Sequence, residues 1–198
     1  AFAPTALSFT DEGLNGLLLH AMNDRETPVF GKVRVSVVRG EAVLAEGERA
    51  LELAPRAHTS LSADALLGGF RDLTYAYRFG PLAHDAVCAR WEIAREGARN
   101  EAVTAFYFPR PVEGPWLAVE GPDPGLSGEF LGEDALLLRA KRLALFVRID
   151  AGPEPSLLSD NYFHMAPGEE KRVTGAFGSS ASVVALNGHS ELRVKRGE

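Results

Sequence analysis

The residue types that most often carry chemistry are sparse in this chain and widely spaced. No two of its histidines stand at the His-Glu-x-x-His spacing that brings two imidazoles onto one metal ion. Cys88, the single cysteine, has no second cysteine with which to form a disulfide or a thiolate zinc site. The sequence also lacks a Gly-x-Ser-x-Gly elbow, a phosphate loop and a dinucleotide fingerprint. We therefore expect no metal ion, no cofactor and no catalytic residue.

The dipeptide Asn100-Glu101 looks like the Asn-Glu pair that carries the general acid in many barrel-type retaining glycosidases. That chemistry requires the glutamate at the C-terminal end of a buried parallel strand, facing a second carboxylate about 5 Å away. Glu101 instead follows a polar turn between two strands that we predict to be antiparallel. We therefore interpret it as a solvated hairpin residue.

Four residues are candidates for contact with a sugar or with a neighbouring domain. Asp160, Tyr162 and Phe163 combine a carboxylate with aromatic rings, as carbohydrate sites do. Trp116 is a second candidate platform, within a proline-rich stretch. For the first three we favour a structural interpretation, in which Asp160 and Asn161 bond to local backbone and an aromatic ring packs in the core. For Trp116 we favour a wedge between two domains.

The elements that must position these residues are β-strands. Apolar residues recur mostly with period two between frequent glycines and prolines, which is typical of an all-β protein. The pattern predicts strands at Leu17–Asn23, Lys32–Arg39, Ala42–Glu48, Leu73–Phe79, Val87–Arg95 and Val103–Phe108, and then at Ala135–Arg139, Leu143–Ile149, Tyr162–Met165, Glu170–Gly175, Ser182–Leu186 and Glu191–Lys195.

Local signals refine this picture. On the strand that begins at Val87, parity places Trp91 in a sandwich core and turns Cys88 to the other face. Ser62 is suited to cap the one short helix that we predict, over residues 60–68. Pro167-Gly168 suits the central positions of a type II turn, where we expect a hairpin to close.

The connector divides the chain into two domains. Residues 109–124 carry five prolines, a composition that suits a linker better than the interior of a sheet. Each half has enough strands for a sandwich of its own. We predict two immunoglobulin-like antiparallel β-sandwich domains in tandem, at residues 1–111 and, smaller, at residues 112–198.

Composition and charge limit the partners. The 198 residues are 45% hydrophobic and carry 27 acidic and 21 basic side chains, for a net charge of -6. This is globular composition, and the basic residues are scattered, so we expect no nucleic-acid partner. No apolar run approaches the roughly 20 residues of a membrane helix, so we expect no membrane association. The compartment stays open between cytoplasm and periplasm or exterior. The chain opens on Ala1 without a targeting signal, which is compatible with a mature product or with a piece of a longer polypeptide, and we favour the piece.

Several segments, taken in order, carry a family resemblance. They are Gly13–Leu17, Leu19–Asp24, Val33–Val38, Ala105–Pro109, Pro122–Gly125, Leu158–Phe163, Pro167–Glu169 and Val184–Asn187. Together they resemble the immunoglobulin-like domains that follow the catalytic barrel in β-mannosidases of glycoside hydrolase family 2. The resemblance covers nearly the whole chain, and its departures are His164–Ala166 and the tail from Glu191 to Glu198.

The resemblance implies a multidomain enzyme whose TIM barrel holds two catalytic glutamates. Neither glutamate has a counterpart here, so no residue of this chain inherits either role. We expect a non-catalytic accessory region that supports the barrel of a parent enzyme, which removes terminal β-D-mannose with retention. The alternative is an independent carbohydrate-binding module in which Trp116, Tyr162 or Phe163 stacks on a glycan. A third option is an adhesion or chaperone sandwich that accepts an added strand. A homodimer also stays open.

Overall fold

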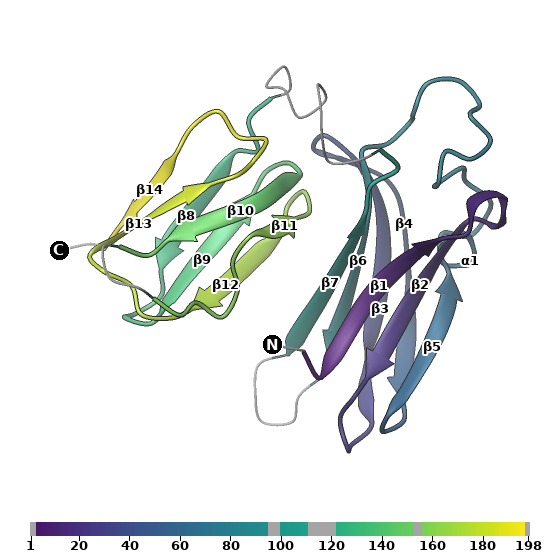
Figure 1. Ribbon diagram of the computed structural model, residues 1–198, viewed down its shortest axis with the longest axis horizontal. Helices are drawn as coiled ribbons and strands as arrows, with labels where there is room; N and C mark the ends of the chain where they lie inside the picture. The colour runs from purple at the N-terminus through teal and green to yellow at the C-terminus, as the bar shows by residue number, and fades with distance from the viewer. Residues whose placement is uncertain (1–2, 95–99, 111–121, 153–155, 197–198) are drawn as a thin grey trace. The chain divides into compact units, whose positions relative to one another are not determined.

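The computed structural model describes residues 3–94, 100–110, 122–152 and 156–196, whose regular secondary structure is almost entirely β-strand (Figure 1). The chain divides into two compact units. The first, called the first domain here, comprises Ala1–Arg39 and Val43–Arg110, and the second domain comprises Gly40–Ala42 and Pro111–Glu198. The expected all-β class is confirmed, whereas the boundary that we predict between residues 111 and 112 lies outside the described residues.

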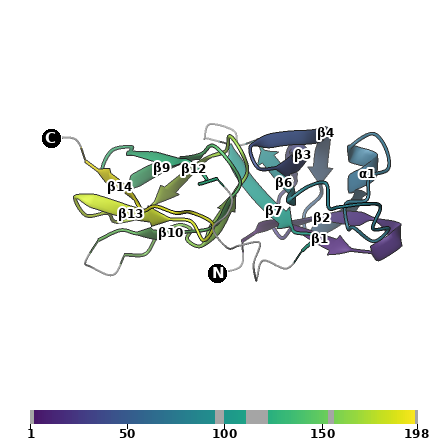
Figure 2. The same cartoon turned by 90° about the horizontal axis from the view of Figure 1, so that it is seen from above.

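The first domain packs a three-stranded sheet, β1-β2-β5, against a four-stranded sheet, β4-β3-β6-β7. Figure 2 shows β3 and β4 on one side of this domain and β1 and β2 on the other. The element bounds are β1 Thr5–Asp11, 3-10 helix η1 Gly13–Asn15, β2 Leu17–Asn23, β3 Val29–Arg39, β4 Ala42–Leu53, β5 Ala57–Ser62, α1 Ala63–Leu66, β6 Ala86–Ile93 and β7 Glu101–Tyr107.

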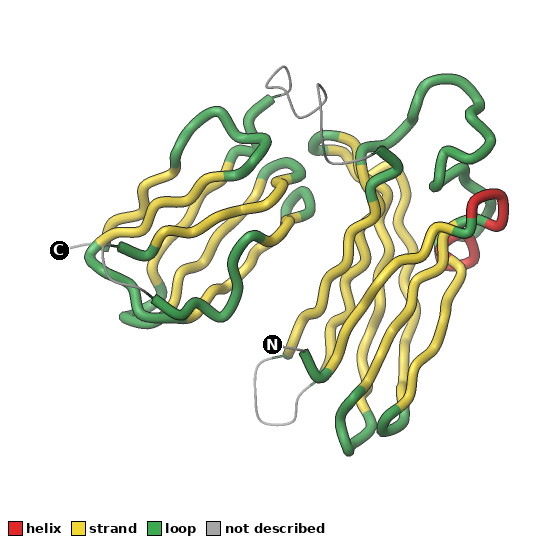
Figure 3. The backbone as a smooth tube through the Cα atoms, viewed as in Figure 1, coloured by secondary structure: helices red, strands yellow, loops and turns green. Residues whose placement is uncertain are grey.

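The second domain repeats this arrangement with shorter strands. Its sheets are β12-β9-β8 and β11-β10-β13-β14, so each strand holds the same place as the strand seven positions earlier in the chain. Figure 3 shows the described residues of this domain as strands joined by loops. The bounds are β8 Leu126–Phe130, β9 Ala135–Ala140, β10 Ala144–Asp150, β11 Phe163–Met165, β12 Glu170–Thr174, β13 Ser180–Val184 and β14 Leu192–Lys195. Both domains are immunoglobulin-like β-sandwiches, as expected.

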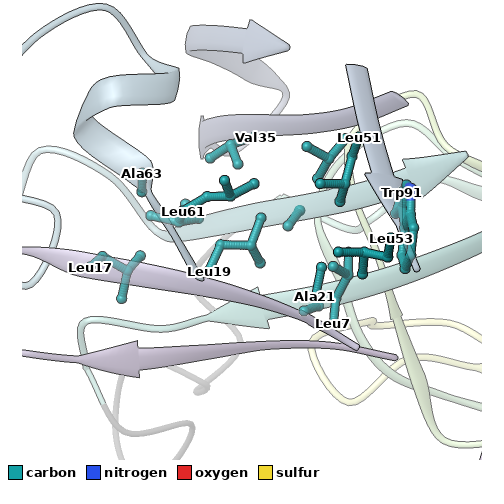
Figure 4. Close-up of a cluster of buried hydrophobic side chains, with 14 of the residues drawn as sticks. Leu7, Leu17, Leu19, Ala21, Val35, Leu51, Leu53, Leu61, Ala63 and Trp91 are labelled. Atoms are coloured by element: carbon teal, nitrogen blue, oxygen red, sulfur yellow. The ribbon is translucent and has the colours of Figure 1, made fainter. Parts of the chain in front are cut away.

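Period-two patterning produces the core of the first domain. Val33, Val35 and Val37 all point inward from β3 and are nearly inaccessible to solvent. Trp91 on β6 is fully buried in the same cluster, as predicted, while Cys88 is not part of it. Figure 4 shows Trp91 and the leucines of β1, β2, β4 and β5 gathered in this interior. Each such large side chain contributes about 1.5–3 kcal/mol by leaving water.

The core of the second domain follows the same rule. Leu136 and Leu138 of β9 face Val147 of β10 and Val183 of β13, and each of these four side chains is fully buried. The alternate residues of β10 are exposed, so its burial pattern reads as a half-buried strand. The outer face of β10 is therefore free to carry polar side chains.

The strands that sequence patterning missed are edge strands. β1 and β5 flank β2, and β8 flanks β9, so each of the three has one paired neighbour. They carry few large apolar residues, and β8 includes Gly128. Their extended form depends on antiparallel pairing with a buried neighbour, a signal that alternation within the strand does not contain. The strand predicted at Leu17–Asn23 has the predicted bounds, and the other strand predictions are confirmed with shifted bounds, except for Leu73–Phe79.

The strand predicted at Leu73–Phe79 is wrong. The chain forms a loop there, in which Tyr75 and Arg78 adopt left-handed backbone angles (φ 57° and 53°). The carboxylate of Asp72 accepts hydrogen bonds from the backbone N–H groups of Tyr77 and Arg78, at 3.2 and 3.1 Å. The Asp72 side chain thus supplies backbone hydrogen bonds that a neighbouring strand would otherwise provide.

The predicted helix cap is confirmed, and the predicted turn is confirmed without its hairpin. Ser62 caps the short helix α1, since its hydroxyl accepts a hydrogen bond from the N–H of Ala65. Gly168 has the positive φ (74°) expected of a type II turn, and Glu169 N–H donates to Ala166 O. The hairpin expected there is wrong, because β11 pairs with β10 and β12 pairs with β9. The turn connects the two sheets instead.

No helix among the described residues is long and apolar enough to cross a membrane.

Candidate functional site

The segment that leads into β11 connects the two sheets of the second domain through side-chain hydrogen bonds. Ser159 extends β12, because its N–H donates to Thr174 O (2.7 Å) and its hydroxyl accepts from Thr174 N–H (2.9 Å). Two residues later, Asn161 binds β10. Its Oδ1 accepts from Ile149 N–H (2.8 Å) and its Nδ2 donates to Ile149 O (2.9 Å). The polar residues of this segment therefore replace strand pairing.

Two other residues of the resembling segments serve the backbone in the same way. Asn187 holds the opposite end of β10, since Leu145 N–H donates to its Oδ1 and its Nδ2 donates to Leu143 O, both at 2.9 Å. Asp123 accepts from the N–H groups of Gly125 (2.8 Å) and His189 (3.0 Å), and these bonds lower its pKa. The carboxylate thus joins the start of the domain to the loop between β13 and β14.

The structure separates the three candidate residues near β11. Asp160 forms an ion pair with Lys171 (Oδ2 to Nζ, 2.7 Å). Phe163 is only 8% exposed and packs in the core, with Lys171 Nζ 4.4 Å from its ring centre. Its ring face is therefore not available for stacking on a sugar. Tyr162 is 61% exposed and adopts a left-handed φ of 59°. Trp116 lies outside the described residues.

Sequence reasoning missed a shallow hollow of about 490 Å³ on the outer face of β10, β13 and β14. Its lining includes Arg148 and Asp150 of β10, Ser182 of β13, and Glu191 and Arg193 at β14. Glu191 Oε1 lies 3.2 Å from Arg193 Nε. Hydrogen bonding by Ser182 and by Arg193 lowers the pKa of Glu191, so its carboxylate is ionised at neutral pH. The sequence shows the period-two alternation of these polar residues. It does not show which strands are neighbours, and that determines which of these residues meet in the hollow.

The corresponding face of the first domain is closed by ion pairs. There Arg34 of β3 contacts Glu46 (3.6 Å) and Glu48 (3.1 Å) of β4, and Lys32 contacts Glu48 (2.8 Å). The strand that occupies the place of β4 in the second domain is β11, which has only three residues, Phe-His-Met. It offers Arg148 no carboxylate.

A β-bulge in β10 exposes an aromatic ring two residues before Arg148. Between Ala144 and Val147 the pairing of β10 with β11 shifts by one residue, and Phe146 adopts a left-handed φ of 45° with its side chain 39% exposed. Its ring contacts His164 edge to face at 4.5 Å, and its N–H donates to His164 Nδ1. Burial lowers the pKa of His164, which keeps this ring nitrogen an acceptor at neutral pH.

Glu101 is not the solvated hairpin residue that we expected. Its carboxylate lies at the start of β7 and forms an ion pair with Arg25 (2.8 Å) while accepting a hydrogen bond from Thr5 Oγ1 (2.9 Å). The side chains of Arg25 and Glu101 are 21% and 31% exposed. This partly buried pair ties three strands or loops of the first domain together. Among the described residues, no three His, Cys, Asp or Glu side chains converge as a metal site would require.

These features define the class: immunoglobulin-like β-sandwich domains in which the distinctive polar residues bind backbone. The family model Ig_mannosidase, an Ig-fold domain, matches residues 122–193 of the second domain. The resemblance to β-mannosidase domains is therefore confirmed for residues 122–193. A search of curated protein sequences gives no match.

Solved structures of two glycoside-cleaving enzymes share the fold of the chain. One is a β-D-mannosidase from Dictyoglomus thermophilum, with 16% identity, a TM-score of 0.61, and coverage of 98% of this chain and 22% of that protein. Another is the exo-chitosanase CsxA from Amycolatopsis orientalis, with 12% identity, a TM-score of 0.59, and coverage of 97% and 26%. At these identities the likeness shows a shared fold alone. The chain thus spans about a quarter of the length of each protein.

Proposed function

We propose that this chain is a non-catalytic accessory region of a β-mannosidase-like glycoside hydrolase. The observation that carries the proposal is the match of residues 122–193 to the Ig-fold domain of mannosidases. The partner is the catalytic barrel of the same parent chain, and the parent reaction is removal of terminal β-linked mannose with retention. Rigid sandwiches packed on a barrel stabilise it by burying apolar surface.

The carboxylates of the hollow support a non-catalytic role. A retaining glycosidase needs one carboxyl group that stays protonated near neutral pH, opposite a second that is ionised. Glu191 has a lowered pKa and an arginine partner, which is the reverse of what a general acid needs. Asp150 accepts a hydrogen bond from Gly152 N–H and lies on an open sheet face. An open face with ionised carboxylates is better suited to binding a ligand than to protonating a leaving group.

Hydrolysis of a chromogenic β-mannoside tests the proposal. We expect no turnover by the chain of residues 1–198, and turnover by the full product of its gene, including any barrel encoded next to this region. Glu101→Gln and Glu191→Gln variants are the controls for a carboxylate active site. Turnover by residues 1–198 that either variant abolishes would refute the accessory role, as would a full gene product that contains no barrel.

A further inference from the structure

We propose that the outer face of β10, β13 and β14 binds a short neutral oligosaccharide, with Arg148 and Tyr162 as its principal contacts. The inference deepens the proposed function and rests on it only for the choice of sugar. The surface is distinct from the buried Phe163, which faces the opposite side of its sheet.

Arg148 is the arginine of the hollow that has no close hydrogen-bond partner among the described residues. It is exposed on β10 and has no hydrogen bond or close ion pair among the described residues, although its charge helps to lower the pKa of the Glu191 carboxyl in the same hollow. The comparable Arg34 of the first domain has two glutamates of β4 around it. β11 supplies no carboxylate in their place, and Arg148 lines the hollow, where its donors are available to a ligand beside Glu191.

Two exposed aromatic residues lie close to Arg148, one on β10 and one on the segment paired beside it. Val147 pairs with Phe163, and Ile149 is bound by Asn161, so Tyr162 lies beside Arg148 in register. The ring of Tyr162 is 61% exposed. Phe146 precedes Arg148 by two residues on β10 and is exposed as well. An apolar ring next to placed polar groups is the arrangement that recognises a sugar, whose C–H face stacks while its hydroxyls bond.

The charge balance of the hollow selects a neutral ligand. Two guanidinium groups, Arg148 and Arg193, are matched by two carboxylates, Asp150 and Glu191. A phosphate or another anion would meet the carboxylates, and a cation would meet the arginines. Adjacent donors and acceptors suit the paired hydroxyls of a sugar, which both donate and accept. The volume of about 490 Å³ lies within the range of small-molecule sites.

Calorimetric titration of the 198-residue chain with mannohexaose and with cellohexaose tests the inference. We expect binding of at least one of these neutral oligosaccharides, and at least a tenfold loss of affinity in Arg148→Ala and in Tyr162→Asn. Arg34→Ala is the matched control, because it removes the same charge from the corresponding strand of the first domain, and it should leave the affinity unchanged. Circular dichroism of each variant should match that of the parent chain.

Several outcomes would overturn the inference. They are no heat with either oligosaccharide, equal losses in Arg148→Ala and Arg34→Ala, and Arg148-dependent binding of inorganic phosphate instead of sugar. Self-association that Arg148→Ala abolishes would assign the face to a second copy of the chain and would also contradict it. The accessory role fails by a different measurement, the turnover of a chromogenic mannoside, so the two failures can be told apart.

Discussion

The side chain of Asn161 pairs with the backbone of Ile149 as a neighbouring strand would. Ile149 N–H donates to Asn161 Oδ1, and Asn161 Nδ2 donates to Ile149 O. Asn161 lies in the segment that leads into β11, and Ile149 lies in β10. A single side chain therefore continues the sheet beyond the last backbone pair between β10 and β11. Asn187 does the same at the other end of β10. The two asparagines fix the ends of the strand that carries Arg148.

Replacing either asparagine should loosen β10. Asn161→Ala and Asn187→Ala each leave two backbone groups without partners, which should lower the free energy of unfolding of the second domain by about 1–3 kcal/mol. Hydrogen exchange at the amides of Ile149 and Leu145 measures the effect at each end separately. Asn15→Ala, at an exposed position of η1, is the control and should leave both exchange rates unchanged. Unchanged exchange in both asparagine variants would contradict the strand-end role.

Neighbouring aromatic residues should respond in opposite ways to truncation. Phe163→Ala empties part of the core and should destabilise the second domain by about 3–5 kcal/mol. Tyr162→Asn should leave stability unchanged or raise it by up to about 1 kcal/mol, because asparagine tolerates the left-handed angle that Tyr162 adopts. Chemical denaturation followed by hydrogen exchange of β9 and β13 amides compares the two. A loss in Tyr162→Asn as large as in Phe163→Ala would refute this assignment of their roles.

Gly47 should be intolerant of a side chain. A Cβ at this position of β4 would lie 1.8 Å from the backbone oxygen of Leu66, at the end of α1. Gly47→Ala must therefore move α1 or bend β4, which we expect to cost about 1–3 kcal/mol of first-domain stability. Gly69→Ala is the matched control, since a Cβ there meets open space and the backbone does not require glycine. Equal urea midpoints for the two variants would show that α1 adjusts without cost.

The stability of the first domain should fall in acid partly because of His84. The ring is 5% exposed and its Nε2 donates to Leu73 O at 3.1 Å. Burial lowers the pKa of His84 below its ordinary value of 6.5. The unfolded chain therefore takes up a proton before the folded domain does, so the contribution of His84 is complete above about pH 6.5 and is lost as the pH falls below it.

The measurement for His84 is the urea midpoint at pH 7.5 and at pH 5.5. The wild-type midpoint should drop between the two values, and the drop should be smaller in His84→Gln, which removes the titrating group. His58→Gln changes an exposed histidine on β5 and should show the wild-type difference. An NMR titration of the His84 ring that gave a value above 6.5 would reverse the predicted sign.

Alternation of apolar and polar residues identified the strands that bury one face, such as β3 and β6. In these strands the residues at every second position are the ones that face the core. It missed β1, β5 and β8, whose conformation comes from pairing at an edge. It was misled at residues 73–79, where Asp72 satisfies the backbone locally. The Ser-Asp-Asn-Tyr-Phe segment was recognised as distinctive, but the split between a buried Phe163 and an exposed Tyr162 depends on the left-handed angle at Tyr162.

The amino-acid sequence alone determines the all-β class, most strands, the inward position of Trp91 and the cap at Ser62. Each of these features depends on residues that are close together in the chain. Only the tertiary structure decided which strands are neighbours. That choice brings Arg148, Ser182 and Arg193 onto one open face, and it sets β11 where the first domain has β4. The pairing energy that selects these neighbours is shared between segments distant in sequence, so no local pattern contains it.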